Sequence, residues 1–162
     1  MSEFSHIDKN GNAVMVDVTD KEETERTAVA TGKIYVCKQI IDAINDGTNK
    51  KGNVFATARI AGIMGAKKTS ELIPMCHPLM LTKVDIDFEI CDSKIPYIIC
   101  TCTAKLKGRT GVEMEALTGV NVALLTVYDM CKAIDKKMVI DEIHLVEKTG
   151  GKSGYFRFDH EN

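Results

Sequence analysis

The chain has 162 residues, of which 44% are hydrophobic and 27% are charged, and its formal net charge is −2. These values are typical of one globular domain, and the net charge argues against a general nucleic-acid binder. The sequence has no run of about 18 apolar residues, which a membrane-spanning helix needs. We expect a flexible arm over residues 1–15 and one domain over residues 16–162, in the reducing cytoplasm that six cysteines without a signal peptide indicate.

The first part of the domain is predicted to be a strand followed by two helices. Apolar side chains alternate from Thr27 to Val36, which predicts a strand. The spacing becomes helical from Cys37 to Ile44, with Gly47 as its C-terminal stop. Asn53 is suited to cap a second helix, whose many alanines and glycines would let another backbone approach closely.

Two strands are predicted after a loop that is bracketed by prolines. Pro74 and Pro78 stiffen the segment PMCHP and bias His77 to an extended conformation. An ordinary loop histidine is one interpretation, and a side chain placed for a ligand is the other, which the rigid loop favours. Strict alternation then predicts strands over residues 81–90 and 97–106.

Cys100 and Cys102, in the second of these strands, resemble a metal-binding pair. Residues i and i+2 of a strand share a face, and this face is apolar, so packing in the core is the favoured interpretation. The other cysteines have no CxxC spacing, and we expect no metal site.

One long helix is predicted from Thr110 to Lys137. Thr110 and Glu113 have the spacing of a capping box, and apolar residues recur at steps of three and four along one face. Val122 and Leu125 make a second face apolar. We therefore expect this helix to be buried on two sides.

Asp129 and Lys132 lie three residues apart on the long helix, so their side chains are neighbours on its surface. Spacing alone favours a plain salt bridge. The apolar surroundings favour a functional pair in a partly dry site, because burial and a mutual charge move the pKa of a lysine toward the range of an acid–base catalyst. The residues alone leave both interpretations open.

A last, less regular strand is expected over residues 139–148, followed by a glycine loop. The order of the elements predicts an α+β, ferredoxin-like fold in βαββαβ order with an extra helix. Its mostly antiparallel four-stranded sheet would have the helices packed on one face.

The glycine loop, Gly150–Gly154, does not match the pattern of a nucleotide-binding P-loop, because Val146 stands where the first glycine should be. Glycine N–H groups can still bind phosphate together with the ammonium groups of Lys148 and Lys152.

Four long motifs carry a resemblance to a known family: KGNVFATARIAGI, IPMCHPL, GVEMEALT and YDMCKA. They closely resemble the molybdenum cofactor biosynthesis protein C (MoaC) family, the cyclic pyranopterin monophosphate synthases. The likeness extends from MVDVTDKEETER near the start of the chain to GGKSG near its end.

The resemblance implies a phosphorus–oxygen lyase of molybdenum cofactor biosynthesis. Members of the family convert (8S)-3′,8-cyclo-7,8-dihydroguanosine 5′-triphosphate to cyclic pyranopterin monophosphate and release pyrophosphate. Opening and closing the rings are proton transfers, which need general acids and bases. A triphosphate needs lysine and arginine side chains around it.

The resemblance also assigns roles to individual residues. Asp129 and Lys132 match the catalytic acid–base pair of the family, with Lys132 as the main acid or base. The residues expected to bind substrate are Met75, Cys76 and His77 of PMCHP, Met114 and Glu115 of VEMEA, the charged residues Arg26, Lys51 and Lys148, and Lys152 from the glycine loop.

The family forms hexamers, as trimers of dimers, so the resemblance implies a homo-oligomer with sites near subunit boundaries. It further implies a small-molecule substrate and a transient contact with the upstream radical enzyme, with no nucleic-acid or membrane partner. No tightly bound cofactor is expected, and Mg²⁺ is a candidate companion of the triphosphate and pyrophosphate. The alternatives are a non-catalytic guanine-nucleotide-binding oligomer and a purely structural oligomer.

Overall fold

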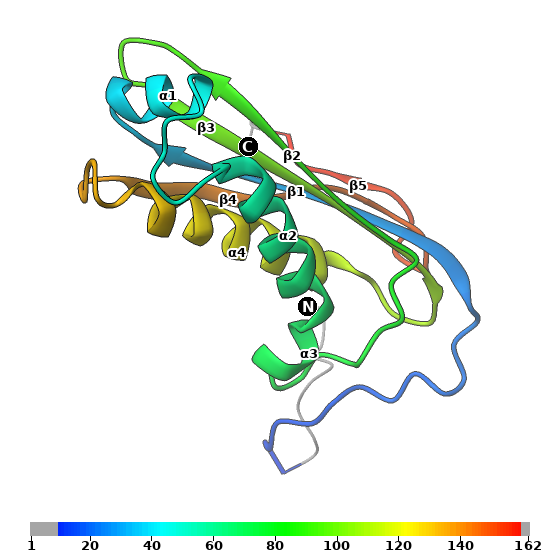
Figure 1. Ribbon diagram of the computed structural model, residues 1–162. Coiled ribbons are helices and arrows are strands. Elements are labelled where there is room, and N and C mark those ends of the chain that lie inside the picture. The colour runs from blue at the N-terminus through cyan, green and yellow to red at the C-terminus, as the bar shows by residue number, and fades with distance from the viewer. Residues whose placement is uncertain (1–9, 160–162) are drawn as a thin grey trace.

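A computed structural model describes residues 10–159 of the chain (Figure 1). Residues 1–9, which make up most of the expected flexible arm, and residues 160–162 lie outside the described residues. The elements, in chain order, are β1 (Thr24–Tyr35), α1 (Lys38–Asn45), α2 (Val54–Lys67), α3 (Thr69–Leu72), β2 (Lys83–Cys91), β3 (Tyr97–Gly108), α4 (Glu113–Cys131), β4 (Val139–Thr149) and β5 (Phe156–Arg157).

The strands form one sheet in the order β2-β3-β1-β4-β5, and each neighbouring pair is antiparallel. The first four strands have the order expected of a ferredoxin-like fold, so the predicted α+β class is confirmed. The prediction of four strands missed β5, which pairs with Glu147 and Lys148 at the end of β4. A strand of two residues is too short to show alternation in the sequence.

One face of the sheet forms the core, and Figure 1 shows α2 and α4 lying across that face. Alternate side chains of β1 and β3 are buried there, as the sequence pattern predicts. Cys100 and Cys102 are both fully buried among them, so their predicted role in core packing is confirmed. The largest buried side chains of this core are Ile34, Ile40, Ile41, Ile86, Ile98 and Leu124.

The helix α2 begins where the sequence predicts. The side chain of Asn53 accepts a hydrogen bond from the backbone N–H of Ala56 at 2.9 Å, which caps the helix. Gly62 faces α4 so closely that an added Cβ would lie 2.8 Å from the carbonyl oxygen of Gly119. The small residues of α2 therefore allow the close approach of two helix backbones, as expected.

The helix α4 is shorter than the predicted range at both ends. Val112 is its N-cap and makes no side-chain capping bond, so the predicted capping box of Thr110 and Glu113 is wrong. The carboxylate of Glu113 lies instead 3.5 Å from the ammonium of Lys148. After Cys131 the chain turns, because it must bring β4 back alongside β1.

The second apolar face of α4 is partly covered within this chain. Val122 packs against α2, where its Cγ2 would lie 2.6 Å from a Cβ added at Gly65, so α4 is buried against α2 as well as against the sheet. Leu125, on the same face, remains 58% exposed. Across residues 10–159, we find no helix with the length and apolarity needed to cross a lipid bilayer.

Candidate active site

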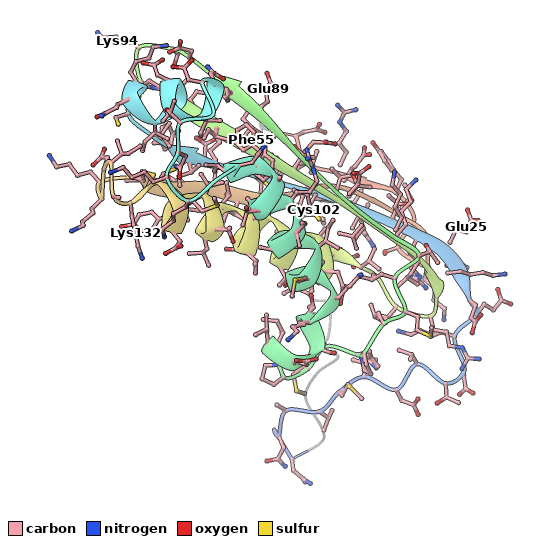
Figure 2. All side chains as sticks on the ribbon, in the orientation of Figure 1. Glu25, Phe55, Glu89, Lys94, Cys102 and Lys132 are labelled. Atoms are coloured by element: carbon pink, nitrogen blue, oxygen red, sulfur yellow. The ribbon has the colours of Figure 1, made fainter. Side chains whose placement is uncertain are left out.

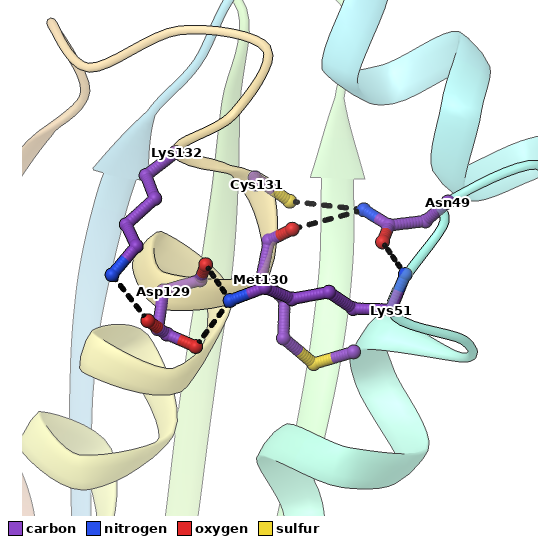
Figure 3. A network of polar contacts seen from close by, with 6 residues as sticks. All are labelled: Asn49, Lys51, Asp129, Met130, Cys131 and Lys132. Atoms are coloured by element: carbon purple, nitrogen blue, oxygen red, sulfur yellow. Dashed lines mark hydrogen bonds and ion pairs between the residues drawn. The ribbon is translucent and has the colours of Figure 1, made fainter.

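The C-terminal end of α4 carries the first group of predicted site residues (Figure 3). Lys132 Nζ lies 2.7 Å from Asp129 Oδ1. Lys51 Nζ, from the loop between α1 and α2, lies 2.7 Å from Asp129 Oδ2 and donates to the Asp129 carbonyl oxygen at 2.8 Å. We call Lys51, Asp129 and Lys132 the C-terminal cluster.

The end of a helix explains why these groups gather. The last four carbonyl groups of an α-helix have no partner within the helix. Lys51 satisfies the carbonyl of Asp129, and the side chain of Asn49 satisfies that of Met130 at 3.2 Å. The negative end of the helix dipole also favours ammonium groups at this position.

The charges of the C-terminal cluster keep one another ionised. Hydrogen bonds from Lys132 and then Lys51 lower the pKa of Asp129 to about 2, and the bond to Asp129 raises the pKa of Lys132. The predicted dry site, with a lysine pKa moved down toward neutrality, is therefore wrong for this chain. The side chains of Lys132 and Asp129 are 49% and 55% exposed.

The N-terminal end of α4 carries a second group around a cavity of about 230 Å³. Met75, Cys76 and His77 line this cavity together with Glu115. The Nε2–H of His77 donates to the carbonyl oxygen of Val16 at 2.8 Å, so the ring is held against the segment that precedes β1. Its role toward a ligand stays a prediction.

Glu115 is only 4% exposed, and burial raises its pKa to about 7. The pKa of Cys76 is also raised, mainly by burial and to a smaller extent by the nearby charge of Glu115. A carboxyl group with this pKa is partly protonated near neutrality, so it can donate as well as accept a hydrogen bond at the cavity wall.

A wider hollow of about 670 Å³ opens beside this cavity, and the two share Lys21, Thr110 and Gly111. Arg26 and Lys152 line the hollow. Lys148 contacts Glu113 and donates to the hydroxyl of Ser153. We call the predicted residues at this end of α4 the N-terminal cluster: Arg26, Met75, Cys76, His77, Glu115, Lys148 and Lys152.

The two clusters lie far apart within one chain. Glu115 and Asp129 are fourteen positions apart on α4, which corresponds to about 21 Å along a helix axis. Figure 2 shows Lys132 at one end of the molecule and Glu25, the sequence neighbour of Arg26, at the other. The structure therefore groups the predicted site residues into two places rather than one. We assign Met114, whose side chain is 38% exposed, to neither cluster.

Sequence reasoning missed several polar residues at both ends of α4. Lys21 and Arg109 line the wider hollow, and Asn49 contacts the end of α4; all three lie outside regular elements, where no periodicity marks a residue. Glu113 belongs to the VEMEA motif, but its spacing from Thr110 predicts helix capping and not a place at the site. Within residues 10–159, no group of three or more His, Cys, Asp or Glu side chains is arranged to hold a metal ion.

Known proteins resemble the chain over nearly its full length. The model of the MoaC family matches residues 15–151. Two curated relatives named cyclic pyranopterin monophosphate synthase are each 58% identical to this chain over 157 residues. In the relative from Clostridium perfringens (strain 13 / Type A), the match covers 97% of this chain and 99% of the relative. In the relative from Novosphingobium aromaticivorans, it covers 97% of this chain and 98% of the relative. A third, from Clostridium botulinum (strain Alaska E43 / Type E3), has the same name and is 59% identical over 155 residues, which cover 96% of this chain and 97% of the relative.

Proposed function

Since the chain belongs to the MoaC family, we propose that it makes cyclic pyranopterin monophosphate from the cyclised dihydroguanosine triphosphate and releases pyrophosphate. The chain is thus a lyase of molybdenum cofactor biosynthesis. The family match bears out the resemblance of the four sequence motifs. The observation that carries the proposed chemistry is the C-terminal cluster, which holds two ammonium groups on one carboxylate.

The ionisation of this cluster suggests how the reaction starts. Asp129 is a carboxylate and Lys132 is an ammonium at neutral pH, because each stabilises the charge of the other. Lys132 would therefore act first as a general acid, and the neutral amine left behind could take up a proton in a later step. Asp129 would orient Lys132, and Lys51 would supply a second positive charge for phosphate or pyrophosphate oxygens.

The N-terminal cluster is suited to binding the substrate. Arg26, Lys148 and Lys152 provide positive charge around the wider hollow and the glycine loop, as a triphosphate requires. The smaller cavity presents His77 and Glu115, whose hydrogen-bonding groups can recognise a polar ring system. Glu115 can serve either as donor or as acceptor because of its pKa of about 7.

We infer that the two clusters serve one substrate by coming from different subunits. Proton transfer requires contact at roughly 3 Å, whereas the clusters of one chain are about 21 Å apart along α4. A complete site would therefore combine the N-terminal cluster of one subunit with the C-terminal cluster of another. The exposed apolar side chains of Ile60, Met64 and Leu125 on the helices support such association. A hexamer built as a trimer of dimers would contain these sites.

Turnover tests the proposed function. The purified chain should convert the cyclised dihydroguanosine triphosphate to cyclic pyranopterin monophosphate with one pyrophosphate released per product, and it should leave ordinary GTP unchanged. Tight binding of the cyclised nucleotide without pyrophosphate release would favour the non-catalytic nucleotide-binding oligomer. Neither binding nor turnover would favour the structural oligomer.

A further inference from the structure

The loop between α1 and α2 places Lys51 in the C-terminal cluster, and Asn49 holds this loop in two ways (Figure 3). The side-chain Nδ2 of Asn49 donates to the carbonyl oxygen of Met130 at 3.2 Å and approaches the sulfur of Cys131 at 3.9 Å. Its Oδ1 accepts from the backbone N–H of Lys51 at 2.9 Å. One amide group therefore connects the end of α4 to the backbone of Lys51.

The backbone of Asn49 also closes the turn that presents Lys51. Its carbonyl oxygen accepts from the N–H of Gly52 at 3.0 Å. Gly52 has a φ of +94°, a conformation that other residues rarely adopt. The side-chain bond to the N–H two residues later is the pattern by which asparagine fixes a turn. The direction in which Lys51 leaves the loop thus depends on Asn49.

We propose that Asn49 is a positioning residue for the proposed reaction: it attaches the α1–α2 loop to the end of α4 and so directs the ammonium of Lys51 onto Asp129. The proposal rests on the proposed function only for its kinetic consequence. A lysine side chain has four rotatable carbon–carbon bonds and loses much conformational freedom when it is held in one place. When the loop backbone is anchored, the ammonium of Lys51 has fewer positions away from Asp129 available to it. A residue that takes no part in the chemistry can affect the rate in this way.

The first test measures the carboxyl of Asp129 directly, without substrate. Its pKa, followed by the carbon-13 NMR shift of the carboxyl group, should be about 2 in the unmodified protein. Asn49→Ala should raise it part of the way toward the ordinary value of 3.8, because Lys51 is then held less often at the carboxylate. Lys51→Ala sets the largest possible effect, since it removes the ammonium completely. Asn45→Ala, the same change at an exposed position at the end of α1, should have no effect.

The second test separates positioning from a general loss of structure by kinetics. Asn49→Ala should lower kcat roughly tenfold, within the hundredfold that a misplacement of about 1 Å can cause. The double variant Asn49→Ala/Lys51→Ala should have the same kcat as Lys51→Ala alone, because Asn49 acts through Lys51. If Asn49→Ala lowers kcat by the same factor in both backgrounds, or does not shift the pKa of Asp129, the proposal is wrong.

Asn49→Asp provides a second variant that keeps the turn. Its carboxylate can still accept from the N–H of Lys51 but cannot donate to the carbonyl of Met130. It should be at least as impaired as Asn49→Ala in both measurements, and a normal kcat in a folded Asn49→Asp protein would refute the role of the link to α4. An unmodified protein without turnover would refute the proposed function, while the pKa measurement would still test whether Asn49 positions Lys51.

Discussion

The ammonium of Lys132 lies 2.7 Å from the carboxylate of Asp129, across one turn at the end of α4. The other carboxylate oxygen of Asp129 is held by Lys51 at the same distance. One negative charge between two positive charges leaves the cluster with net positive charge, which suits a substrate that carries a triphosphate. The bond to Asp129 also raises the pKa of Lys132, so Lys132 is not a base before substrate binds.

We expect Lys132→Ala to keep the fold and lower kcat by about a hundredfold or more, the usual scale for losing a general acid or base. Lys132→Arg keeps the charge but cannot release a proton near neutral pH, so it should be almost as inactive. Asp129→Asn should be severely impaired as well, and the double variant should be little worse than the worse single one if the pair acts as a unit. Steady-state kinetics with the cyclised nucleotide measures these effects.

Near-normal turnover by Lys132→Arg would reduce the pair to an exposed salt bridge, an interaction that contributes at most about 1 kcal/mol to stability.

Glu115 should make stability depend on pH between about 4.5 and about 7. Burial raises its pKa from 4.5 to about 7 in the folded chain, so the folded state binds more protons than the unfolded state in this range. Stability from this group should therefore fall as pH rises from 4.5 to 7 and then remain constant. Glu115→Gln should remove this dependence and stabilise the protein at pH 8, on the order of 3 kcal/mol.

Urea unfolding at pH 5 and pH 8 checks this prediction. Glu113→Gln is the matched control, because Glu113 is paired with Lys148 rather than buried alone, and its loss should not stabilise the protein at pH 8. Equal stability of the Glu115→Gln variant and the unmodified protein at pH 8 would contradict the raised pKa.

Two glycines near the C-terminus allow a clean test of the glycine loop. Gly151 and Gly154 both have positive φ, +72° and +61°, so alanine should cost about 1–2 kcal/mol of backbone strain at either position. Only at Gly151 would the added Cβ collide with Arg26, 2.0 Å from its Nη1. Gly151→Ala should therefore raise KM roughly tenfold by displacing the guanidinium, whereas Gly154→Ala should leave KM unchanged. A similar KM for both variants would remove Arg26 from substrate binding.

A site shared between subunits predicts complementation between two inactive variants. Lys132→Ala damages the C-terminal cluster, and Arg26→Ala damages the N-terminal cluster. A dimer with one chain of each kind would have one site with both changes and one intact site. Refolding an equal mixture should restore about a quarter of normal activity, because about half of the dimers are mixed and each has one intact site of two. No recovery, with mixed oligomers confirmed by mass spectrometry, would place the whole site within one chain.

Cys100 and Cys102 should be needed for stability and not for catalysis. Both are fully buried, and burial raises the pKa of each thiol to about 12, so neither is a thiolate at neutral pH. Replacing them together by alanine and valine should lower stability by roughly 1–2 kcal/mol through poorer packing and preserve kcat. A folded double variant without activity would contradict this role.

The sequence predicted the strands and helices better than the geometry of the site. Alternation in β1 and β3 and the cap at Asn53 are local patterns, which depend only on neighbouring residues. The end of α4 and the strand β5 are set by where the chain must return to the sheet, which no local pattern contains.

The candidate site shows the same limit. The motifs identified Asp129 and Lys132 as neighbours, as the structure has them. The spacing did not reveal that Lys51 shares the same carboxylate, because Lys51 is 78 residues away in the chain. Exposure also depends on tertiary structure. The apolar residues around Asp129 predict a dry site, but the side chain of Leu125 is 58% exposed in this chain.

One helix, α4, carries site residues at both of its ends, and this has a consequence for how two sites influence each other. If each complete site combines two subunits, the two ends of every α4 belong to two different sites. A substrate that fixes Asp129 at one end then restrains the same helix that carries Glu115 at the other end. The two reactions in a dimer would share a mechanical element of nineteen residues, and this provides the physical connection through which occupancy of one site can change affinity at the other.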